Sequence, residues 1–222
     1  MIQHPGPWSA LVTLPLASTG ETVLRVLQLE QMVLEWESTF ETLPAFNRLL
    51  VTGNPADWDP IRVELKLAQL AASAVSRPLP AAPTAKTVTL PACYDIEVAP
   101  DLAEVAAKAR MSNTDLARLH VDGAYTVLAT GFAPGFAYLG DVAPAIAVPR
   151  RSVPRQSVPA GSIGLADQRT GVYPSASPGG WRLIGRVPPS LFADAHERLT
   201  RFSPGQAVRF RAISLKDFER EA

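Results

Sequence analysis

Apolar positions follow a helical period in two stretches of the first third of the chain. Within residues 21–40 and again within 59–75, apolar side chains recur every three or four residues and leave the opposite face polar. Ser18 or Thr19 can cap the first of these segments, because a side-chain oxygen can accept from the free N–H groups of the first turn. The pattern predicts two amphipathic helices.

Short β-prone runs separate the two helices. Residues 9–16 and 46–52 read as strands, and a further strand is expected at 87–94. The resulting order, strand-helix-strand-helix with a last strand, is typical of a small α+β lobe of split β-α-β, ferredoxin-like type. The sequence therefore predicts this fold for an N-terminal lobe.

A proline-rich segment follows the second helix. Residues 77–86 read RPLPAAPTAK, with three prolines and no periodicity, which favours a linker. We therefore expect a domain boundary there, with a small α+β lobe over residues 1–80 and a second domain over 81–222.

The second domain starts with two short helices and then becomes rich in strands. Helices are expected at 100–109 and 112–120, where Ser112 and Asp115 form a variant of the capping box. A strand begins at 125–132, residues 206–213 alternate strictly between apolar and polar, and the last eight residues favour a short helix. Glycine and proline gather between Gly131 and Pro188 among Val, Ile, Tyr and Trp, which is typical of short strands joined by shaped turns.

Composition and charge narrow the class of protein. The chain has 222 residues, 47% of them hydrophobic and 19% charged, and Lys plus Arg balance Asp plus Glu at 21 each. Without a basic stripe, nucleic acid is not an expected partner. No run of eighteen apolar residues occurs, so we expect no membrane segment and a cytoplasmic location. Cys93 is the one cysteine, which excludes an internal disulfide and favours a small buried side chain in a reducing compartment.

Three histidines offer limited acid–base or metal chemistry. His120 ends the second short helix, where the helix dipole would favour its charged form and general acid–base work; hydrogen bonding to nearby carbonyls is the alternative. His4 and His196 have no such context and are expected to be solvated. No metal-ligand spacing is present, so no metal site is expected.

Arg150, Arg151 and Arg155 form the one local excess of positive charge. Prolines separate them, and planar guanidinium groups on a stiff backbone suit carboxylate or phosphate oxygens. The alternatives are pairing with Asp141, with Asp167 or with glutamates, or simple solvation.

Two glycine-rich loops add backbone donors. The segments 160–164 and 177–181 can offer N–H groups and hydroxyls to an anion, although turn geometry explains most of their glycines. Neither a GxxxxGK[ST] loop nor a GxSxG elbow is present, so the sequence shows neither an ATP site nor a serine nucleophile of its own. The candidate polar and aromatic contacts here are Gly161, Ser162, Thr170, Tyr173, Ser177, Gly179, Gly180 and Trp181, with Trp181 favoured as a core residue.

Three long motifs resemble a known family. They are GFAPGFAYLG at 131–140, VPRRSVPRQSVPAGSIGLA at 148–166 and TGVYPSASPGGWRLIGRVP at 170–188. Together they resemble the signature of the allophanate hydrolase subunit 1 family, also called the Kip-type inhibitor family or the carboxyltransferase domain, subdomain C and D. The resemblance implies that the second domain is a cyclophilin-like β-barrel. The chain departs from the family at Trp8–Leu11 and at Ala99, which replaces a glycine.

The resemblance also implies a function. Bacterial members include one component of ATP-dependent 5-oxoprolinase, which opens 5-oxo-L-proline to L-glutamate with ATP hydrolysis, so we expect an enzyme component that is inactive without its partners. Those partners would be a homologue of the C-type subunit, in a heterodimer or heterotetramer, and a homologue of the A-type subunit; ATP with Mg²⁺ would be the cofactor, and no prosthetic group is expected. In this scheme His120 and Arg151 are catalytic, and Arg150, Arg155 and the two loops bind the substrate or an anion. The alternatives are a regulatory binder that inhibits a sensor histidine kinase, and a urea-degradation component related to allophanate hydrolase.

Overall fold

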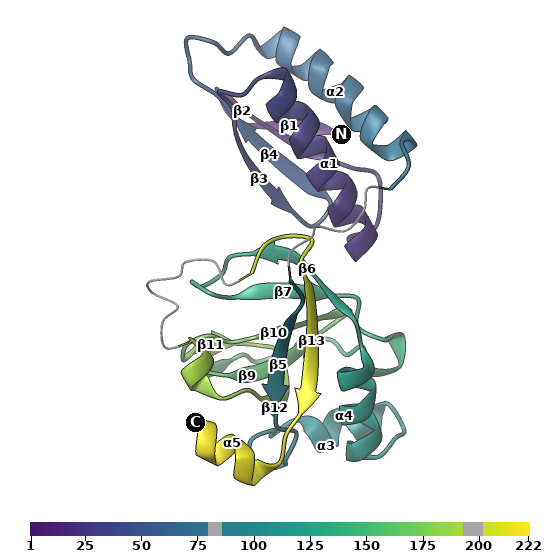
Figure 1. Ribbon diagram of the computed structural model, residues 1–222, viewed down its shortest axis with the longest axis vertical. Coiled ribbons are helices and arrows are strands. Elements are labelled where there is room, and N and C mark those ends of the chain that lie inside the picture. Colours follow the sequence, from purple (N-terminus) through teal and green to yellow (C-terminus); the bar gives the residue numbers. More distant parts are fainter. Residues whose placement is uncertain (80–85, 193–201) are drawn as a thin grey trace. The chain divides into compact units, whose positions relative to one another are not determined.

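The computed structural model describes residues 1–79, 86–192 and 202–222, and the chain divides into two compact units, Met1–Thr84 and Ala85–Ala222 (Figure 1). Residues 80–85 of the predicted linker lie outside the described residues. So does His196, and its predicted solvation stays a prediction.

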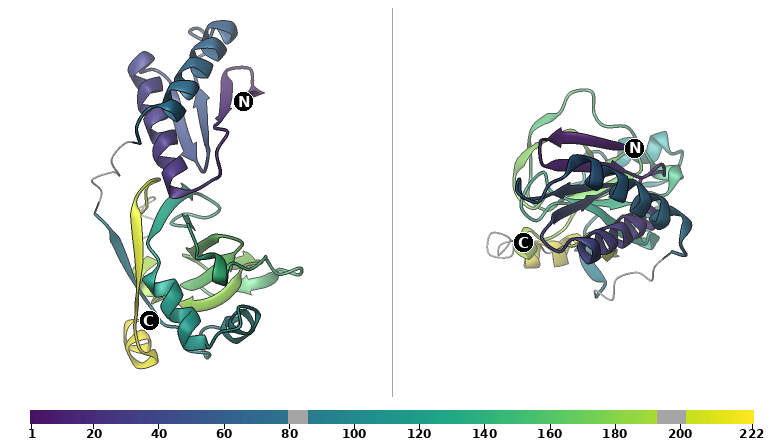
Figure 2. Two further views of the ribbon diagram at one scale, coloured as in Figure 1. Left: turned by 90° about the vertical axis from the view of Figure 1, so that its right-hand side faces the viewer. Right: turned by 90° about the horizontal axis from the view of Figure 1, so that it is seen from above.

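The first unit is a four-stranded antiparallel sheet with two helices on one face (Figure 2). Its strands lie side by side in the order β1-β2-β4-β3. Apolar side chains of both helices and of the inner sheet face form one core, which includes Val26, Leu29, Leu49 and Leu67. The elements are β1 (Ile2–Gly6), β2 (Ser9–Thr13), α1 (Gly20–Trp36), β3 (Glu41–Ala45), β4 (Arg48–Thr52) and α2 (Pro60–Ser76).

Side-chain caps set the start of both helices. Thr19 Oγ1 accepts from the N–H of Thr22 at 3.3 Å, which confirms the predicted cap of α1. Asp59 Oδ1 accepts from two N–H groups of the first turn of α2, at 3.0 and 3.1 Å. Helix α1 ends at Trp36, four residues before the predicted end, because Glu37 adopts an extended backbone. Phe40 then packs edge-on against the Trp36 ring at 5.6 Å.

The strand order of the first unit differs from the prediction. The pattern predicts that residues 87–94 complete this sheet, but β5 (Val88–Ala92) belongs to the second unit, where it pairs in parallel with β13 (Ala207–Ala212). The place beside β2 is filled by β1, which the sequence pattern does not predict.

The topology follows from these pairings. Since β2 and β3 both run antiparallel to β4, they are parallel to each other and are joined through α1, which makes a split β-α-β unit. The ferredoxin-like chain order is wrong, because the strand that should come last in the lobe comes first. Edge strand β1 exposes the middle three of its five residues and contains Pro5, so it carries no apolar alternation.

The second unit is built on a seven-stranded mixed sheet that nearly closes into a barrel (Figure 1). The strands follow the order β12-β9-β10-β7-β6-β13-β5. The two ends of this order meet where Cys93, just after β5, exchanges two backbone hydrogen bonds of 2.8 Å with Arg186 at the end of β12. The cyclophilin-like form of this barrel stays a prediction.

Short helices and a separate hairpin complete the second unit. Ser112 accepts from the N–H of Asp115 at 3.1 Å, which confirms the predicted cap of the second short helix. Strands β8 and β11 pair with each other outside the main sheet. The remaining elements are α3 (Leu102–Lys108), α4 (Asn113–Asp122), β6 (Tyr125–Thr130), β7 (Ala137–Gly140), β8 (Arg155–Val158), β9 (Ser162–Ala166), β10 (Arg169–Val172), β11 (Ser177–Gly179), β12 (Arg182–Arg186), α5 (Leu215–Glu221) and 3₁₀ turns at Pro144–Ile146 and Pro189–Phe192.

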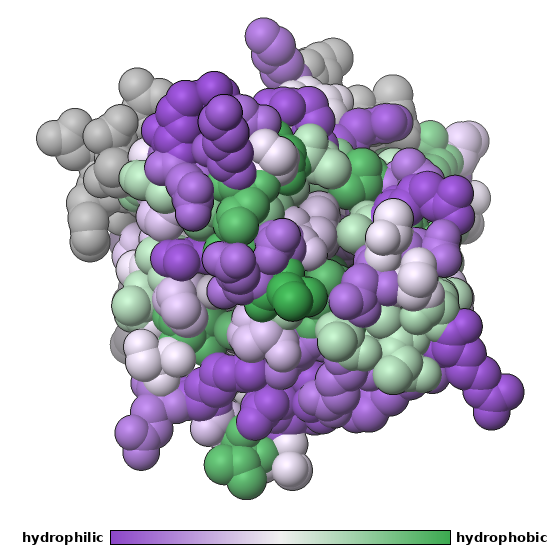
Figure 3. Space-filling view, turned by 90° about the horizontal axis from the view of Figure 1, so that it is seen from below, coloured by the Kyte–Doolittle hydropathy of each residue, from purple (hydrophilic) through white to green (hydrophobic). Residues whose placement is uncertain are grey.

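The second unit has one buried thiol and a mostly polar face (Figure 3). Cys93 is buried as a free thiol, as predicted, and burial raises its pKa. The face of the second unit seen from below is largely hydrophilic, and hydrophobic residues occur on it in small separate groups (Figure 3). None of the helices in the described ranges is both long and apolar enough to cross a bilayer.

Candidate functional site

A small cavity lies in the second unit beside β7, β11 and the start of β12. Its volume is about 100 Å³. Aromatic side chains and two glycines form most of its wall, and one arginine joins them. The lining residues are Phe132, Phe136, Tyr138, Arg150, Tyr173, Gly179, Gly180 and Trp181.

Edge-to-face contacts hold the aromatic wall together. The ring of Phe136 lies 5.6 Å from that of Trp181 and 5.7 Å from that of Tyr173, and both contacts are steeply inclined. A side chain on Gly179 would collide with the Tyr173 ring, so glycine at this position allows the loop to approach the wall. Phe132 stands at the cavity with 61% of its surface exposed and with a φ of 76°, which few residues other than glycine adopt. The cavity is therefore an aromatic recess with one exposed ring.

Arg150 supplies the charge of this cavity. Its guanidinium carbon lies 6.0 Å from the centre of the Trp181 ring, in a cation–π contact. Among the described residues no carboxylate forms an ion pair with Arg150, and it is the one formally charged residue that lines the cavity. An aromatic recess with one positive group is suited to a small planar anion.

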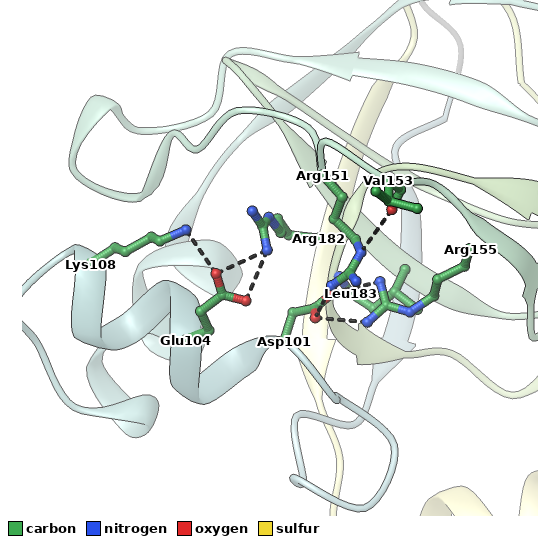
Figure 4. Close-up of polar contacts among 8 residues, drawn as sticks. All are labelled: Asp101, Glu104, Lys108, Arg151, Val153, Arg155, Arg182 and Leu183. Atoms are coloured by element: carbon green, nitrogen blue, oxygen red, sulfur yellow. Dashed lines mark hydrogen bonds and ion pairs between the residues drawn. The ribbon is translucent and has the colours of Figure 1, made fainter.

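The other two predicted arginines bind a buried carboxylate instead (Figure 4). Arg155 grips Asp101 with two hydrogen bonds, of 2.9 Å to Oδ2 and 2.7 Å to Oδ1, while Arg151 approaches Oδ1 at 3.4 Å. The N–H of Leu183 donates to the same carboxylate at 2.7 Å. Burial alone would raise the pKa of Asp101, but the hydrogen bonds from Arg155 and Leu183 and the charges of both arginines outweigh burial and lower it. The pairing predicted as the alternative is present, but with Asp101 rather than Asp141 or Asp167.

A second ion pair joins α3 to β12 beside Asp101 (Figure 4). Glu104 accepts from Arg182 at 2.9 and 2.8 Å and from Lys108 at 2.7 Å. The hydrogen bond from Lys108 is the main cause of the lowered pKa of Glu104. The strand that follows Trp181 is thus tied to α3 at two successive points.

His120 lies in the barrel interior, fully buried, rather than in the cavity. Thr170 Oγ1 lies 3.0 Å from the carbonyl of Gly164 and must donate there, so it accepts from His120 Nε2 at 2.9 Å. Nδ1 is then the acceptor for the Tyr94 hydroxyl at 2.7 Å. Burial lowers the pKa of His120 to about 3, so the expected charged form is wrong: the dipole of the short helix α4 does not offset the loss of water.

The glycine of the 160–164 loop allows a tight turn. Gly161 has φ of +80°, and a Cβ there would collide with the carbonyl oxygen of Val187. Its N–H donates to Tyr173 O at 2.7 Å, and Ser162 is buried in β9. Ser177 in β11 keeps a buried Oγ without a hydrogen-bond partner among the described residues. In the 160–164 loop, the N–H groups of Gly161 and Ser162 are therefore occupied by backbone carbonyls of the chain itself.

The family of the chain follows from its similarity to known proteins. The model of the carboxyltransferase domain, subdomain C and D, matches residues 2–202. The chain belongs to this family. Two curated relatives support the assignment: the 5-oxoprolinase B subunit of Bacillus subtilis is 43% identical over 133 residues, and the 5-oxoprolinase B subunit of Escherichia coli O157:H7 is 35% identical over 187 residues. The first match covers 60% of this chain and 55% of the relative, and the second covers 84% of each.

Solved structures show the same fold. The crystal structure of TTHA0988 matches 96% of this chain with a TM-score of 0.74 at 30% identity, and this chain spans 40% of that longer one. The urea carboxylase of Kluyveromyces lactis matches with a TM-score of 0.73 over 99% of this chain and 22% of its own, at 14% identity, which shows the fold alone. The carboxyltransferase fold of this chain therefore also occurs as a part of longer chains.

The site of this family member gathers some of the predicted residues and separates others. Arg150, Tyr173, Gly179, Gly180 and Trp181 line one cavity. Arg151 and Arg155 lie with Asp101, and His120, Ser162 and Thr170 lie in the barrel interior. The catalytic assignment of His120 has no support from this geometry, because both ring nitrogens are already engaged.

The sequence pattern does not reveal the other half of the cavity wall. Phe132, Phe136 and Tyr138 all come from the 131–140 motif, whose composition predicts only strand and turn. The spacing of its three aromatic residues is the available signal. Phe136 and Tyr138 alternate with small residues after the turn, so the motif brings its rings to one place.

Neither a metal nor ATP has a fitting site in these residues. In the part of the chain that the structure describes, no group of three His, Cys, Asp or Glu side chains could hold a metal ion. Ligand sites for whole cofactors occupy about 300–1,000 Å³, and the aromatic cavity has about 100 Å³. The cavity is therefore too small for ATP with its Mg²⁺.

Proposed function

We propose that this chain is the B-type subunit of an ATP-dependent 5-oxoprolinase complex, and that the aromatic cavity receives 5-oxo-L-proline. The observation that carries the proposal is the combination of an aromatic recess with the cation of Arg150, which has no carboxylate partner in the described part of the chain. The substrate is a five-membered lactam ring with one carboxylate. A small ring suits an aromatic recess of about 100 Å³, and the carboxylate is the complement of the guanidinium.

The residues of this chain bind and orient the substrate in this proposal. Trp181, Tyr173 and Phe136 would pack against the ring and exclude water, and Arg150 would hold the carboxylate. The lactam carbonyl would then point to the mouth of the cavity, where Phe132 is exposed. An unactivated lactam resists hydrolysis, so ATP is needed to activate its oxygen. The aromatic cavity is too small to hold a nucleotide beside the lactam, so we propose that a partner presents ATP at its mouth.

The partners follow from the relatives' names. The curated relatives are called B subunits of 5-oxoprolinase, so we propose that this chain acts with A-type and C-type subunits and has no turnover alone. The chain also spans only 40% of TTHA0988, which fits a protein that works beside further domains.

Binding of 5-oxo-L-proline to the purified chain, measured by calorimetry, tests the proposal. We expect Arg150→Gln to weaken binding by about 10- to 100-fold, since a hydrogen bond to a charged group contributes about 1.5–3 kcal/mol. Arg211→Gln is the matched control, because Arg211 is an exposed arginine of β13 in the same unit. 2-Pyrrolidinone, which lacks the carboxylate, should bind weakly to all three proteins.

Turnover is measured as 5-oxoproline-dependent ATP hydrolysis after mixing with A-type and C-type subunits. Activity only in the mixture supports the proposal. Equal binding to the native chain and the Arg150→Gln variant would overturn the role of Arg150. No turnover with partners that are competent with another B-type subunit would overturn the function.

A second candidate function, inhibition of a sensor histidine kinase, has one supporting observation. Phe132 exposes 61% of its surface beside the cavity, in a left-handed backbone conformation. An exposed aromatic residue is typical of a protein-binding surface, as this alternative requires. Absence of any effect of the intact chain on histidine-kinase autophosphorylation would exclude it.

A further inference from the structure

The carboxylate of Asp101 has an unusual position for a residue at the start of a helix. Asp101 is the N-cap of α3, yet its side chain makes no capping hydrogen bond. The side chain is 4% exposed and instead accepts from Arg155, Arg151 and the N–H of Leu183 (Figure 4). Its own N–H donates to Leu183 O at 2.9 Å. The carboxylate makes these contacts in place of a capping hydrogen bond. Two arginines and one backbone N–H therefore hold it in position.

These contacts reach two chain segments that line the aromatic cavity. Asp101 binds Arg151, which follows Arg150 in the chain and whose N–H donates to the carbonyl of Gly180 at 2.7 Å. Asp101 also binds Leu183, two residues after Trp181. Gly180, Trp181 and Arg150 all line the cavity. One buried carboxylate thus links the segment that carries the cation to the strand that follows the tryptophan beneath it.

The charges at this junction do not cancel. One carboxylate faces two guanidinium groups, and the looser of them, Arg151 at 3.4 Å, keeps 32% of its side chain exposed. The excess positive charge adds to that of Arg150 and favours an anion nearby. Removal of the carboxylate would leave Arg151 and Arg155 to repel each other within a partly buried region.

We infer that Asp101 is the positioning residue of the aromatic cavity, which holds the Arg150 segment at the distance from Trp181 that a small carboxylate ligand requires. Asp101 does not line the cavity, so it acts through Arg151, Arg155 and Leu183. The ligand in this inference rests on the proposed function, whereas the link between Asp101 and Trp181 does not.

Fluorine NMR of the full chain labelled with 5-fluorotryptophan tests the link without a ligand. The chain has four tryptophans, of which Trp181 is the one in the second unit, and its resonance is assigned with Trp181→Phe. We expect Asp101→Asn to move or broaden the Trp181 resonance and to leave those of Trp8, Trp36 and Trp58 in place. Asp101→Glu, which keeps the charge, should restore part of the native position.

Asp217→Asn is the matched control, because it removes an exposed ion pair with Arg220, 2.9 Å long, from the same unit. It should leave the Trp181 resonance unchanged. If Asp101→Asn does not fold, Arg151→Gln is the second variant. It removes the longer of the two arginine contacts to Asp101 and should produce a smaller shift of the same resonance. A native Trp181 resonance in folded Asp101→Asn or in Arg151→Gln would overturn the inference and leave Asp101 a stabilising residue only.

Kinetics with partner subunits give the second readout. We expect Asp101→Asn to raise KM for 5-oxo-L-proline by about tenfold or more, of the order expected for a misplaced binding group, and to change kcat much less. A fall in kcat with an unchanged KM would contradict positioning. If native protein fails to bind 5-oxo-L-proline, the proposed function fails, but the fluorine result still decides the role of Asp101.

Discussion

The pH dependence of stability should reveal the buried imidazole of His120. Its folded-state pKa is about 3, against 6.5 for an ordinary histidine, because burial disfavours the charged form. The unfolded chain takes up a proton as the pH falls below 6.5, while the folded chain does not. The contribution of His120 to the free energy of unfolding is therefore fully present above pH 6.5 and is lost progressively as the pH falls toward the folded pKa.

The magnitude follows from proton linkage. One group that binds a proton only in the unfolded state changes the free energy of unfolding by about 1.4 kcal/mol per pH unit. Between about pH 7 and 5.0 the loss should reach about 2 kcal/mol, and it continues at lower pH. His120→Gln should remove this slope, at a cost of about 1–3 kcal/mol at neutral pH for the lost hydrogen bonds and ring contacts.

Urea unfolding of the full chain, followed by amide resonances of the second unit at about pH 7, 6 and 5, measures the slope for both proteins. NMR of the His120 Cε1–H group reports the folded pKa directly. A His120 signal that titrates with its midpoint above about pH 5, or an acid slope that His120→Gln leaves intact, would refute the buried-neutral assignment.

Three further experiments test the fold. Gly161→Ala should lower stability by about 3 kcal/mol, because φ is +80° and the new Cβ meets the carbonyl oxygen of Val187; Gly131→Ala, with nothing within 4 Å, should cost less, and calorimetry of both decides. Asp59→Ala should cost about 1 kcal/mol through the lost cap of α2, and an unchanged melting temperature of the first unit would contradict the cap. The thiol of Cys93 should react with a disulfide reagent only on unfolding, because burial covers it and raises its pKa; rapid labelling of the native chain would show that it is exposed.

The helices of the first unit can be predicted because their signals are local. A capping side chain and a helical period lie within a few residues of each other, and both caps are present. The edge strands β1 and β3 cannot, since each contains a proline, which is uncommon within a strand, and β1 also exposes its middle three residues. The strand pattern counts 87–94 with the first sheet, although the predicted boundary at 77–86 already places these residues in the second domain. The cause is related: nothing in a strand's own sequence states which distant strand it pairs with.

In the candidate site, too, local features can be predicted from the sequence and long-range contacts cannot. The proline-separated arginines are unusual in the sequence, and Arg150 does line a cavity. Which arginine stays available depends on Asp101, 54 residues before Arg155 in the chain, and no periodicity connects the two. The place of His120 at a helix end predicts a charged group, but its chemistry depends on burial by Tyr94, Thr170 and the barrel. Sequence patterns identify the residue types, whereas long-range packing decides which of them are charged and which are free to bind a ligand.

Two buried groups should make the second unit sensitive to acid in different pH ranges. His120 acts between pH 6.5 and about 3. Asp101 has a pKa below its ordinary 3.8, so its contribution is present above that value and is lost only as the pH falls below about 4. Asp101→Asn should therefore lower the whole stability curve but leave the slope between about pH 6.5 and 4.5 unchanged, whereas His120→Gln should flatten that slope. If Asp101→Asn also flattened it, the carboxylate would have to influence the imidazole across the barrel, and the two groups could no longer be treated as independent.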